Sequence, residues 1–273
     1  DSHEDSLSTY LHALAGPLRR IGEVNFVYLS QVVQWLARQP FETIHDRRQL
    51  LDLFDAVVSE TASGYEGQHM TPPTVAKLVV ALVDPRPGER VYDPCFGFAG
   101  FLTAAWIHAE QAGITAFNRR ENMPLEVFGI DINSHAFLMG RTRLGLAGGE
   151  TPHLELGNSL EREPARSPSS EGCDVILANP PVGLKTAREP GRYEHFPIVT
   201  GDAIGLFIQH ALMQLKAQGR AIIAVPEGFL FQSGKMAELR RYLLERGHVE
   251  AVVGLPAGAF LPSTGVKGSL LLL

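Results

Sequence analysis

The sequence predicts an α/β protein whose main domain is a doubly wound, mainly parallel sheet of seven strands, preceded by a small helical domain. From residue 67 onward, runs rich in Val, Ile and Leu alternate with amphipathic stretches of helical period, the order of βαβ units. Before residue 63 only the helical period is found. We expect strands near 91–95, 126–132, 153–157, 174–179, 220–226, 249–255 and 268–273, and helices near 73–83, 99–112, 134–147, 203–217 and 234–246.

The N-terminal stretch repeats apolar residues at helical spacing over residues 7–38. A further helix is expected to start at a cap on Thr43 or Asp46. We therefore expect a helical domain over residues 1–63 and a second domain over residues 67–273, joined by a short glycine-containing linker.

Two segments of the second domain interrupt the alternation. Residues 161–172 contain few apolar side chains, so we expect a disordered surface loop there. The apolar run Leu270–Leu273 would form a strand at the point where the sequence stops, so we expect the domain to be truncated at its C-terminus.

The composition is that of an ordinary soluble domain, with 45% hydrophobic and 20% charged residues. With no apolar run near about 18 residues and no signal peptide before Asp1, we expect a cytoplasmic protein without a membrane segment. The two cysteines, Cys95 and Cys173, provide neither a disulfide framework nor metal-ligand spacing. A net charge of −6 does not fit a protein that holds DNA unaided.

The tripeptide Asn179-Pro180-Pro181 follows a run of apolar residues that predicts a buried strand. Ligands bind at the carboxyl ends of such strands. Two prolines fix φ and remove two N–H groups, so the Asn179 amide and the Pro180 carbonyl would be rigid hydrogen-bond acceptors. Such a pair suits an –NH₂ group, whose nitrogen becomes more nucleophilic when both hydrogens are accepted. The alternative is a simple turn after a core strand.

A second motif, VYDPCFGFAGFL at residues 91–102, combines a strand, an acidic residue, a glycine loop and a helix start. Glycines allow close approach of a ligand, and helix N-termini favour a carboxylate. Asp93 could bind a ligand's amino group, and Asp131, at the end of the next strand, could bind ribose hydroxyls. Asp131 lies 38 residues after Asp93, against about 20 for a dinucleotide fingerprint, and no G-x-G-x-x-G is present. Both carboxylates therefore fit S-adenosylmethionine better than a nicotinamide nucleotide.

From about Gly67 to Leu273 the chain resembles the modification (M) subunits of type I restriction–modification systems, which are DNA adenine methyltransferases. The resemblance is carried by GQHMTPPTVAKLVVALV, DPCFGFAGFL, ANPPVG and the closing segment VEAVVGLPAGAFLPSTGVKGSLLLL. It implies a class I methyltransferase sheet, S-adenosylmethionine as methyl donor and the exocyclic amine of adenine as acceptor. It also implies that the chain acts on DNA together with a specificity subunit and, in the whole system, a restriction subunit.

The resemblance assigns roles to individual residues. Expected at the cofactor are Met70, Thr71, Pro72, Asp93, Pro94, Gly97, Gly100, Phe101, Asp131, Ile132, Asn158 and Asn179. Expected at the reacting amine are Asn179, Pro180, Pro181 and Val182. Basic residues that follow the Asn-Pro-Pro motif, namely Lys185, Arg188 and Arg192, are expected to face nucleic acid.

Three positions depart from the family pattern: Met70 and Val182 replace aromatic residues, and Ala99 replaces a glycine. Stacking on an aromatic side chain contributes roughly 1–3 kcal/mol per base. Phe96 and Phe98 could pack in the core or fill the cofactor pocket, and Cys95 is expected to be structural. Two alternatives therefore stand beside the adenine methyltransferase: a methyltransferase-fold assembly subunit with weakened or lost catalysis, and an Asn-Pro-Pro methyltransferase acting on RNA or on protein glutamine.

Overall fold

A computed structural model describes residues 44–62, 71–115, 125–149, 152–161, 171–186, 192–261 and 265–273. The helices expected over residues 7–38, the linker, and most of the expected disordered loop lie outside these ranges. The described residues from Leu51 onward belong to one compact unit.

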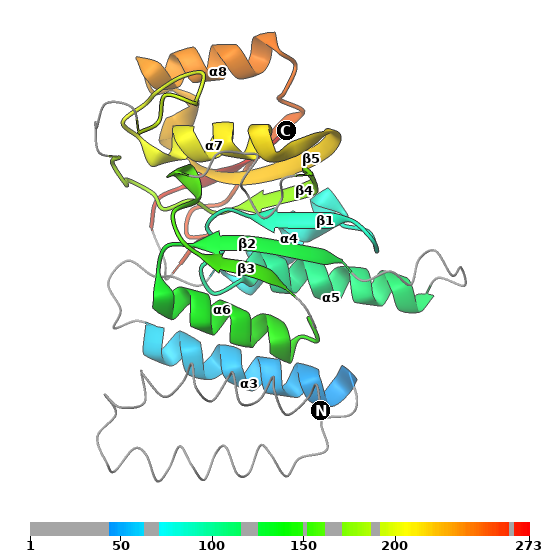
Figure 1. Ribbon diagram of the computed structural model, residues 1–273. Coiled ribbons are helices and arrows are strands. Elements are labelled where there is room, and N and C mark those ends of the chain that lie inside the picture. The colour runs from blue at the N-terminus through cyan, green and yellow to red at the C-terminus, as the bar shows by residue number, and fades with distance from the viewer. Residues whose placement is uncertain are drawn as a thin grey trace. The chain divides into compact units, whose positions relative to one another are not determined.

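The core of this unit is one sheet of seven strands (Figure 1). The strands are β1 (Arg90–Asp93), β2 (Glu126–Asp131), β3 (His153–Leu156), β4 (Cys173–Ala178), β5 (Leu215–Pro226), β6 (Ala251–Gly254) and β7 (Gly268–Leu272). Their order is β3-β2-β1-β4-β5-β7-β6, and β7 is antiparallel to both of its neighbours. The prediction of a doubly wound, mainly parallel sheet is confirmed.

Helices cover both faces of the sheet (Figure 1). These covering helices are α4 (Pro73–Val83), α5 (Gly100–Thr115), α6 (Ser134–Leu146), α7 (Ala203–Gln214) and α8 (Lys235–Glu245). The other described elements are the helix α3 (Ile44–Ala62) and the short 3₁₀ turns η2 (Ser159–Glu161) and η4 (Glu227–Leu230). One hydrophobic core contains side chains of α4, α5 and α6, and the other contains those of α7 and α8. α3 begins at Ile44, so Asp46 lies inside the helix and cannot be its cap.

Alternating side chains of the central strands divide between these two cores. Val175 and Leu177 of β4 pack with α4 and α5, whereas Ile176 packs with α7 and α8. Because both faces of the strand are buried, its sequence is a continuous apolar run and shows no polar alternation. This explains why the run before Asn179 could be identified as a strand.

The largest difference from the predicted boundaries lies between α7 and β5. The helix expected to continue to residue 217 ends at Gln214, and β5 starts at Leu215 instead of residue 220. The pairing of β4 with β5 shifts register between Cys173 and Val175, which lets the start of β5 pair as well. Gly219 permits this irregularity, since a Cβ there would lie 2.8 Å from the Cys173 carbonyl oxygen. Sheet pairing thus overrides the helical pattern of the sequence.

Arg220 of β5 binds the C-terminal end of α4 and the segment that leads into β1. Its guanidinium donates to both carboxylate oxygens of Glu89, each at 2.9 Å. It also donates to the carbonyl oxygens of Val83 and Asp84, the last residue and the C-cap of α4. A planar fork of donors fits this set of acceptors, and a lysine would not.

We expect Arg220→Met to lower the free energy of unfolding by roughly 1–2 kcal/mol, because it removes charge-assisted hydrogen bonds from a side chain that is only a third exposed. The matched control is Lys216→Met on the same strand. Lys216 pairs with Asp174 alone, and solvent screens that pair, so we expect a change below about 1 kcal/mol. Urea denaturation of both variants measures the difference. Equal losses would contradict the role given to Arg220.

Candidate active site

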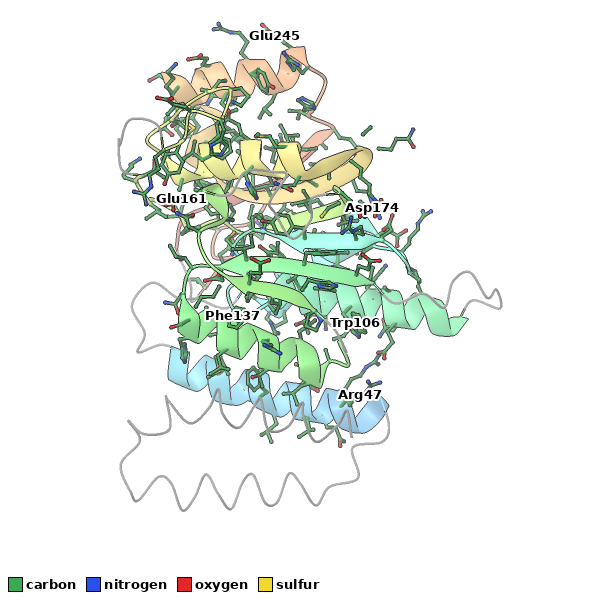
Figure 2. All side chains as sticks on the ribbon, in the orientation of Figure 1. Arg47, Trp106, Phe137, Glu161, Asp174 and Glu245 are labelled. Carbon is green, nitrogen blue, oxygen red and sulfur yellow. The ribbon has the colours of Figure 1, made fainter. Side chains whose placement is uncertain are left out.

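The carboxyl ends of β1, β2, β4 and β5 open onto one cavity of about 830 Å³. Pro94, Asp131, Asn179 and Pro226 line it, each just after or at the end of one of these strands. The chain order reverses between β1 and β4, and open α/β sheets bind ligands at such a reversal. In Figure 2, Glu161 lies on the side of the sheet where these carboxyl ends open onto the cavity, and Asp174 lies on the opposite side.

The loop from β1 to α5 contains the first predicted acidic residue and the glycines. Asp93 is only 2% exposed, and its Oδ1 accepts the Cys95 N–H at 2.9 Å. Gly97 has a φ of 53° and lines the cavity, and a Cβ at this position would meet no atom within 4 Å. Ala99 also has a left-handed φ, 55°, a conformation that favours glycine. This explains why the family pattern has a glycine at the position of Ala99. Its buried methyl group offsets part of the resulting strain.

Close packing from α6 holds the same loop. A Cβ on Gly140 would lie 2.7 Å from the Gly97 carbonyl oxygen and 2.8 Å from the Phe96 ring. Gly140 was not among the residues predicted for the site, although a glycine inside a helical pattern is itself a signal of close approach. Phe96 belongs to the hydrophobic core, whereas Phe98 is buried and also lines the cavity.

Asp131 joins the loop to the next helix. Its Oδ2 accepts the Gly97 N–H at 2.8 Å, and its Oδ1 accepts the Asn133 N–H at 2.8 Å. Asn133 in turn caps α6, because its Oδ1 accepts hydrogen bonds from the His135 and Ala136 N–H groups. Ile132, between them, is 71% exposed at the cavity. Burial raises the pKa of Asp131, and the two N–H donors oppose that rise.

The Asp93 carboxyl has the larger pKa shift. Burial raises its pKa to about 8; the Cys95 N–H opposes the rise, and the nearby Asp131 charge adds to it. Burial, followed by the charges of Asp93 and Asp131, also raises the pKa of the Cys95 thiol well above its usual value. A thiol with a raised pKa is a poor nucleophile. Cys95 lines the cavity, but its environment does not activate it.

Asn179 lies at the end of β4, and its Nδ2 donates to Thr71 Oγ1 at 3.4 Å. This contact orients the amide so that its oxygen is the acceptor left for a ligand. Pro180, Pro181 and Val182 follow along the cavity wall, and Val182 is 46% exposed. The motif thus lines the cavity with Asn179, the two prolines and an aliphatic side chain.

The segment after the motif is held by polar contacts. Lys185 Nζ pairs with Asp202 at 2.8 Å, and Arg192 Nε donates to Glu161 Oε1 at 2.9 Å. Both ends of the Asn158 amide are hydrogen-bonded. Its Oδ1 accepts the Leu160 N–H at 3.1 Å, and its Nδ2 donates to Glu161 Oε1 at 2.7 Å. Lys185, Arg192 and Asn158 all line the cavity, but the pairing neutralises the charge that the two cations offer to a phosphate.

The structure brings most of the predicted residues together. Pro94, Gly97, Asp131, Ile132, Asn158, Asn179, Pro180, Pro181, Val182, Lys185 and Arg192 line the cavity. Thr71, Pro72, Asp93 and Gly100 lie outside the lining, and Phe101 is 1% exposed in the core beneath it. One face of a helix that starts at the cavity packs on the hydrophobic core, and Phe101 lies on that face of α5. Met70 and Arg188 lie outside the described residues.

Several cavity residues were not anticipated from the sequence. Ser159 is buried and donates to the Pro94 carbonyl oxygen at 2.7 Å, which fixes the β1 loop against η2. Tyr193 contributes a ring from the segment before α7. Neither belongs to a recognisable motif, so only the fold brings them to the site.

The described ranges lack two kinds of feature. None of the described helices combines the length and the apolar character needed to cross a membrane. Within the same residues, no three His, Cys, Asp or Glu side chains gather as metal ligands would.

Comparison with known proteins agrees with this geometry. The methylase subunit of the type I restriction enzyme EcoEI from Escherichia coli is 30% identical over 251 residues, which are 90% of this chain and 50% of the relative. A type I restriction-modification methyltransferase subunit from Streptococcus thermophilus matches with a TM-score of 0.74 at 25% identity, over 89% of this chain and 52% of that one. The chain thus spans about half the length of these relatives.

The fold also matches a Listeria monocytogenes protein assigned to the class I S-adenosylmethionine-dependent methyltransferases. The TM-score is 0.67 at 20% identity, over 85% of this chain and 68% of that one, a likeness of fold alone. The family of N-6 DNA methylases matches residues 49–273, a range that includes the glycine loop, Asp131 and the Asn-Pro-Pro motif. By its sequence, its sheet and the residues at its cavity, the chain belongs to the N-6 DNA methylase family.

Proposed function

We propose that this chain catalyses transfer of a methyl group from S-adenosylmethionine to the exocyclic amine of adenine in DNA, as the catalytic part of a type I modification complex. One observation carries the proposal. Residues of the glycine loop, Asp131, and Asn179 and Pro180 of the Asn-Pro-Pro motif line a single cavity, although they follow or end three different strands.

The residues present fit the methyl donor. Asp131 would accept hydrogen bonds from the ribose hydroxyls, and the exposed Ile132 would pack against the adenine ring. The open space at Gly97 would admit the methionine part, whose ammonium group Asp93 would pair with. The donor supplies a methyl group on a sulfonium, which is electrophilic without a metal ion.

The target amine would be activated by hydrogen bonds from its two hydrogens to Asn179 Oδ1 and the Pro180 carbonyl oxygen. Thr71 holds the Asn179 amide in the orientation that leaves this oxygen as the acceptor. Accepting both hydrogens draws the nitrogen lone pair out of the aromatic ring. The nitrogen would then bond to the methyl carbon as the bond from that carbon to sulfur breaks, and S-adenosylhomocysteine would leave. The methylated nitrogen then loses a proton to water, which requires no general base.

The acidity of the chain and the pairing of its cavity cations support a role within a complex. A net charge of −6 disfavours unaided binding of a polyanion. Lys185 and Arg192 are each paired with a carboxylate. We therefore propose that a specificity subunit supplies most of the DNA contacts, and that a restriction subunit joins the same assembly. The EcoEI and Streptococcus thermophilus relatives are subunits of type I systems.

Calorimetric titration of the chain with S-adenosylmethionine tests the first half of the proposal. We expect one site per chain and competition by S-adenosylhomocysteine, which shares every group except the methyl. A titration without saturable heat, repeated by fluorescence or equilibrium dialysis with the same result, would refute the proposed cofactor.

We expect binding of S-adenosylmethionine to release a proton near pH 7. The free Asp93 carboxyl is protonated below about pH 8, and pairing with the ligand's ammonium group favours its carboxylate. Affinity should therefore rise as the pH approaches 8 from below. Titrations at pH 7 in two buffers of different ionisation enthalpy measure the release, and Asp93→Asn should abolish it. A wild-type binding enthalpy independent of the buffer would contradict this assignment.

Val182→Phe is expected to raise the rate of methyl transfer by roughly tenfold in the assembled complex. An aromatic side chain would stack on the flipped base and recover part of the free energy of unstacking. The control is Val252→Phe, which changes a similarly exposed valine, 45% against 46%, on strand β6. We expect no effect there. If the chain were a non-catalytic assembly subunit, no methylation would be detected before or after either change.

A further inference from the structure

We infer that Arg143 of α6 is a positioning residue for the cofactor loop, and that Asp55 of α3 holds it in place. This inference rests on the proposed function, because it concerns the loop that would receive the methionine part of S-adenosylmethionine. No motif of the sequence indicated either residue. Both belong to the compact unit that contains the cavity.

The contacts of Arg143 connect α3 to the loop. Arg143 is 5% exposed, and its Nη2 pairs with Asp55 Oδ2 at 2.5 Å. Its Nη1 donates to the Phe98 carbonyl oxygen at 3.4 Å. A Cβ on Gly100 would lie 3.3 Å from the same Nη1 and 3.2 Å from the Thr71 Cβ. The guanidinium therefore lies directly against the backbone at the start of α5, beside the residue that orients Asn179.

The loop needs such support. Gly97 and Ala99 both have left-handed φ values, and Phe98 lies between them. A non-glycine residue in this region costs roughly 1–2 kcal/mol, and such conformations persist only where the surroundings fix them. A donor on the Phe98 carbonyl oxygen fixes the peptide group that leads into Ala99, the strained position.

The chemistry of the pair favours positioning over simple stabilisation. Burying a guanidinium is unfavourable unless it is paired, and apolar residues of similar volume often stabilise a core equally well or better. Asp55 is the carboxylate that makes the buried charge tolerable. The benefit that apolar side chains could not provide is the directed hydrogen bond to the loop.

The test compares Arg143→Met with Arg141→Met, which removes the same charge from a different face of α6, since residues two apart are about 200° apart around a helix. Each protein is titrated with S-adenosylmethionine and with 5′-deoxy-5′-methylthioadenosine, which has the nucleoside but lacks the amino acid part. We expect Arg143→Met to weaken S-adenosylmethionine roughly tenfold and methylthioadenosine less than about twofold. Arg143→Lys should fall between, because lysine retains the charge but not the two-sided fork. We expect Arg141→Met to match the wild type.

Hydrogen exchange without ligand provides a second readout. Amides of residues 96–103 should exchange at least about fivefold faster in Arg143→Met, with amides of 221–225 unchanged. Adding Asp55→Ala to Arg143→Met should cause no further acceleration in the loop if Asp55 acts through Arg143. Equal losses for both ligands, with faster exchange throughout the sheet, would show a merely structural role. Unchanged loop exchange in Arg143→Met would overturn the inference even if the wild type bound no ligand, whereas failure of wild-type binding alone would refute only the proposed function.

Discussion

Asn179→Ala is expected to lower the rate of methyl transfer by roughly 10²–10³-fold while changing the affinity for S-adenosylmethionine by less than about twofold. The amide oxygen is one of two acceptors for the target amine, and it acts where charge develops in the transition state. Removing a preorganised polar group at such a position reduces the rate of the chemical step and has little effect on binding. Single-turnover measurements of the assembled complex, combined with calorimetry, separate the two effects.

Two further variants test whether the orientation of the Asn179 amide matters for methyl transfer, and whether the effect depends on where in the cavity an amide is removed. Thr71→Val removes the partner of Asn179 Nδ2 and should lower the rate without touching the target amine itself. Asn158→Ala removes another cavity amide, but one on the cofactor side, and should weaken cofactor binding more than it slows transfer. Unchanged transfer by Asn179→Ala would show that the Asn-Pro-Pro motif is only a turn after β4.

Asp131→Ala is expected to weaken S-adenosylmethionine at least tenfold, which corresponds to about 1.4 kcal/mol or more. The carboxylate would bind ribose, and it also accepts the Gly97 N–H and the Asn133 N–H. Its loss therefore removes a ligand contact and releases the glycine loop at the same time. Calorimetric titration measures the change.

Asp131→Asn is the matched variant, because the amide retains the size and one acceptor. The loop should stay in place while the charged contact is lost, so we expect an affinity between those of the wild type and Asp131→Ala. If all three proteins gave the same titration curve, Asp131 could not be the ribose-binding residue.

The strands and the edge that carries the site could be predicted because their signals are local. β4 contains an apolar run that ends at Ala178, directly before Asn179, and β2 ends at Asp131. In a parallel sheet such ends share one edge, so residues 48 positions apart meet at one cavity. The left-handed φ at Ala99 likewise gives a physical reason for the glycine that the family pattern has there.

The misses are positions where tertiary contacts decide the structure. The helical pattern continues past Gln214, but pairing with β4 converts Leu215 and the residues after it into strand. Phe101 follows the glycine loop and was expected at the cofactor, yet its position on α5 turns it into the core. Arg143 and Gly140 touch the loop only because α6 crosses it, and no local pattern reports that crossing.

The central claim is that this cavity methylates the exocyclic amine of adenine, and identification of the methylated nucleoside tests it most directly. The chain, assembled with a specificity subunit, is incubated with duplex DNA and S-adenosylmethionine carrying a labelled methyl group, and the DNA is digested and analysed by mass spectrometry. We predict that the label appears in N6-methyldeoxyadenosine and that Asn179→Ala lowers its rate of appearance by roughly 10²–10³-fold. Label in a methylated cytosine, or label in N6-methyldeoxyadenosine that survives Asn179→Ala undiminished, would contradict the claim.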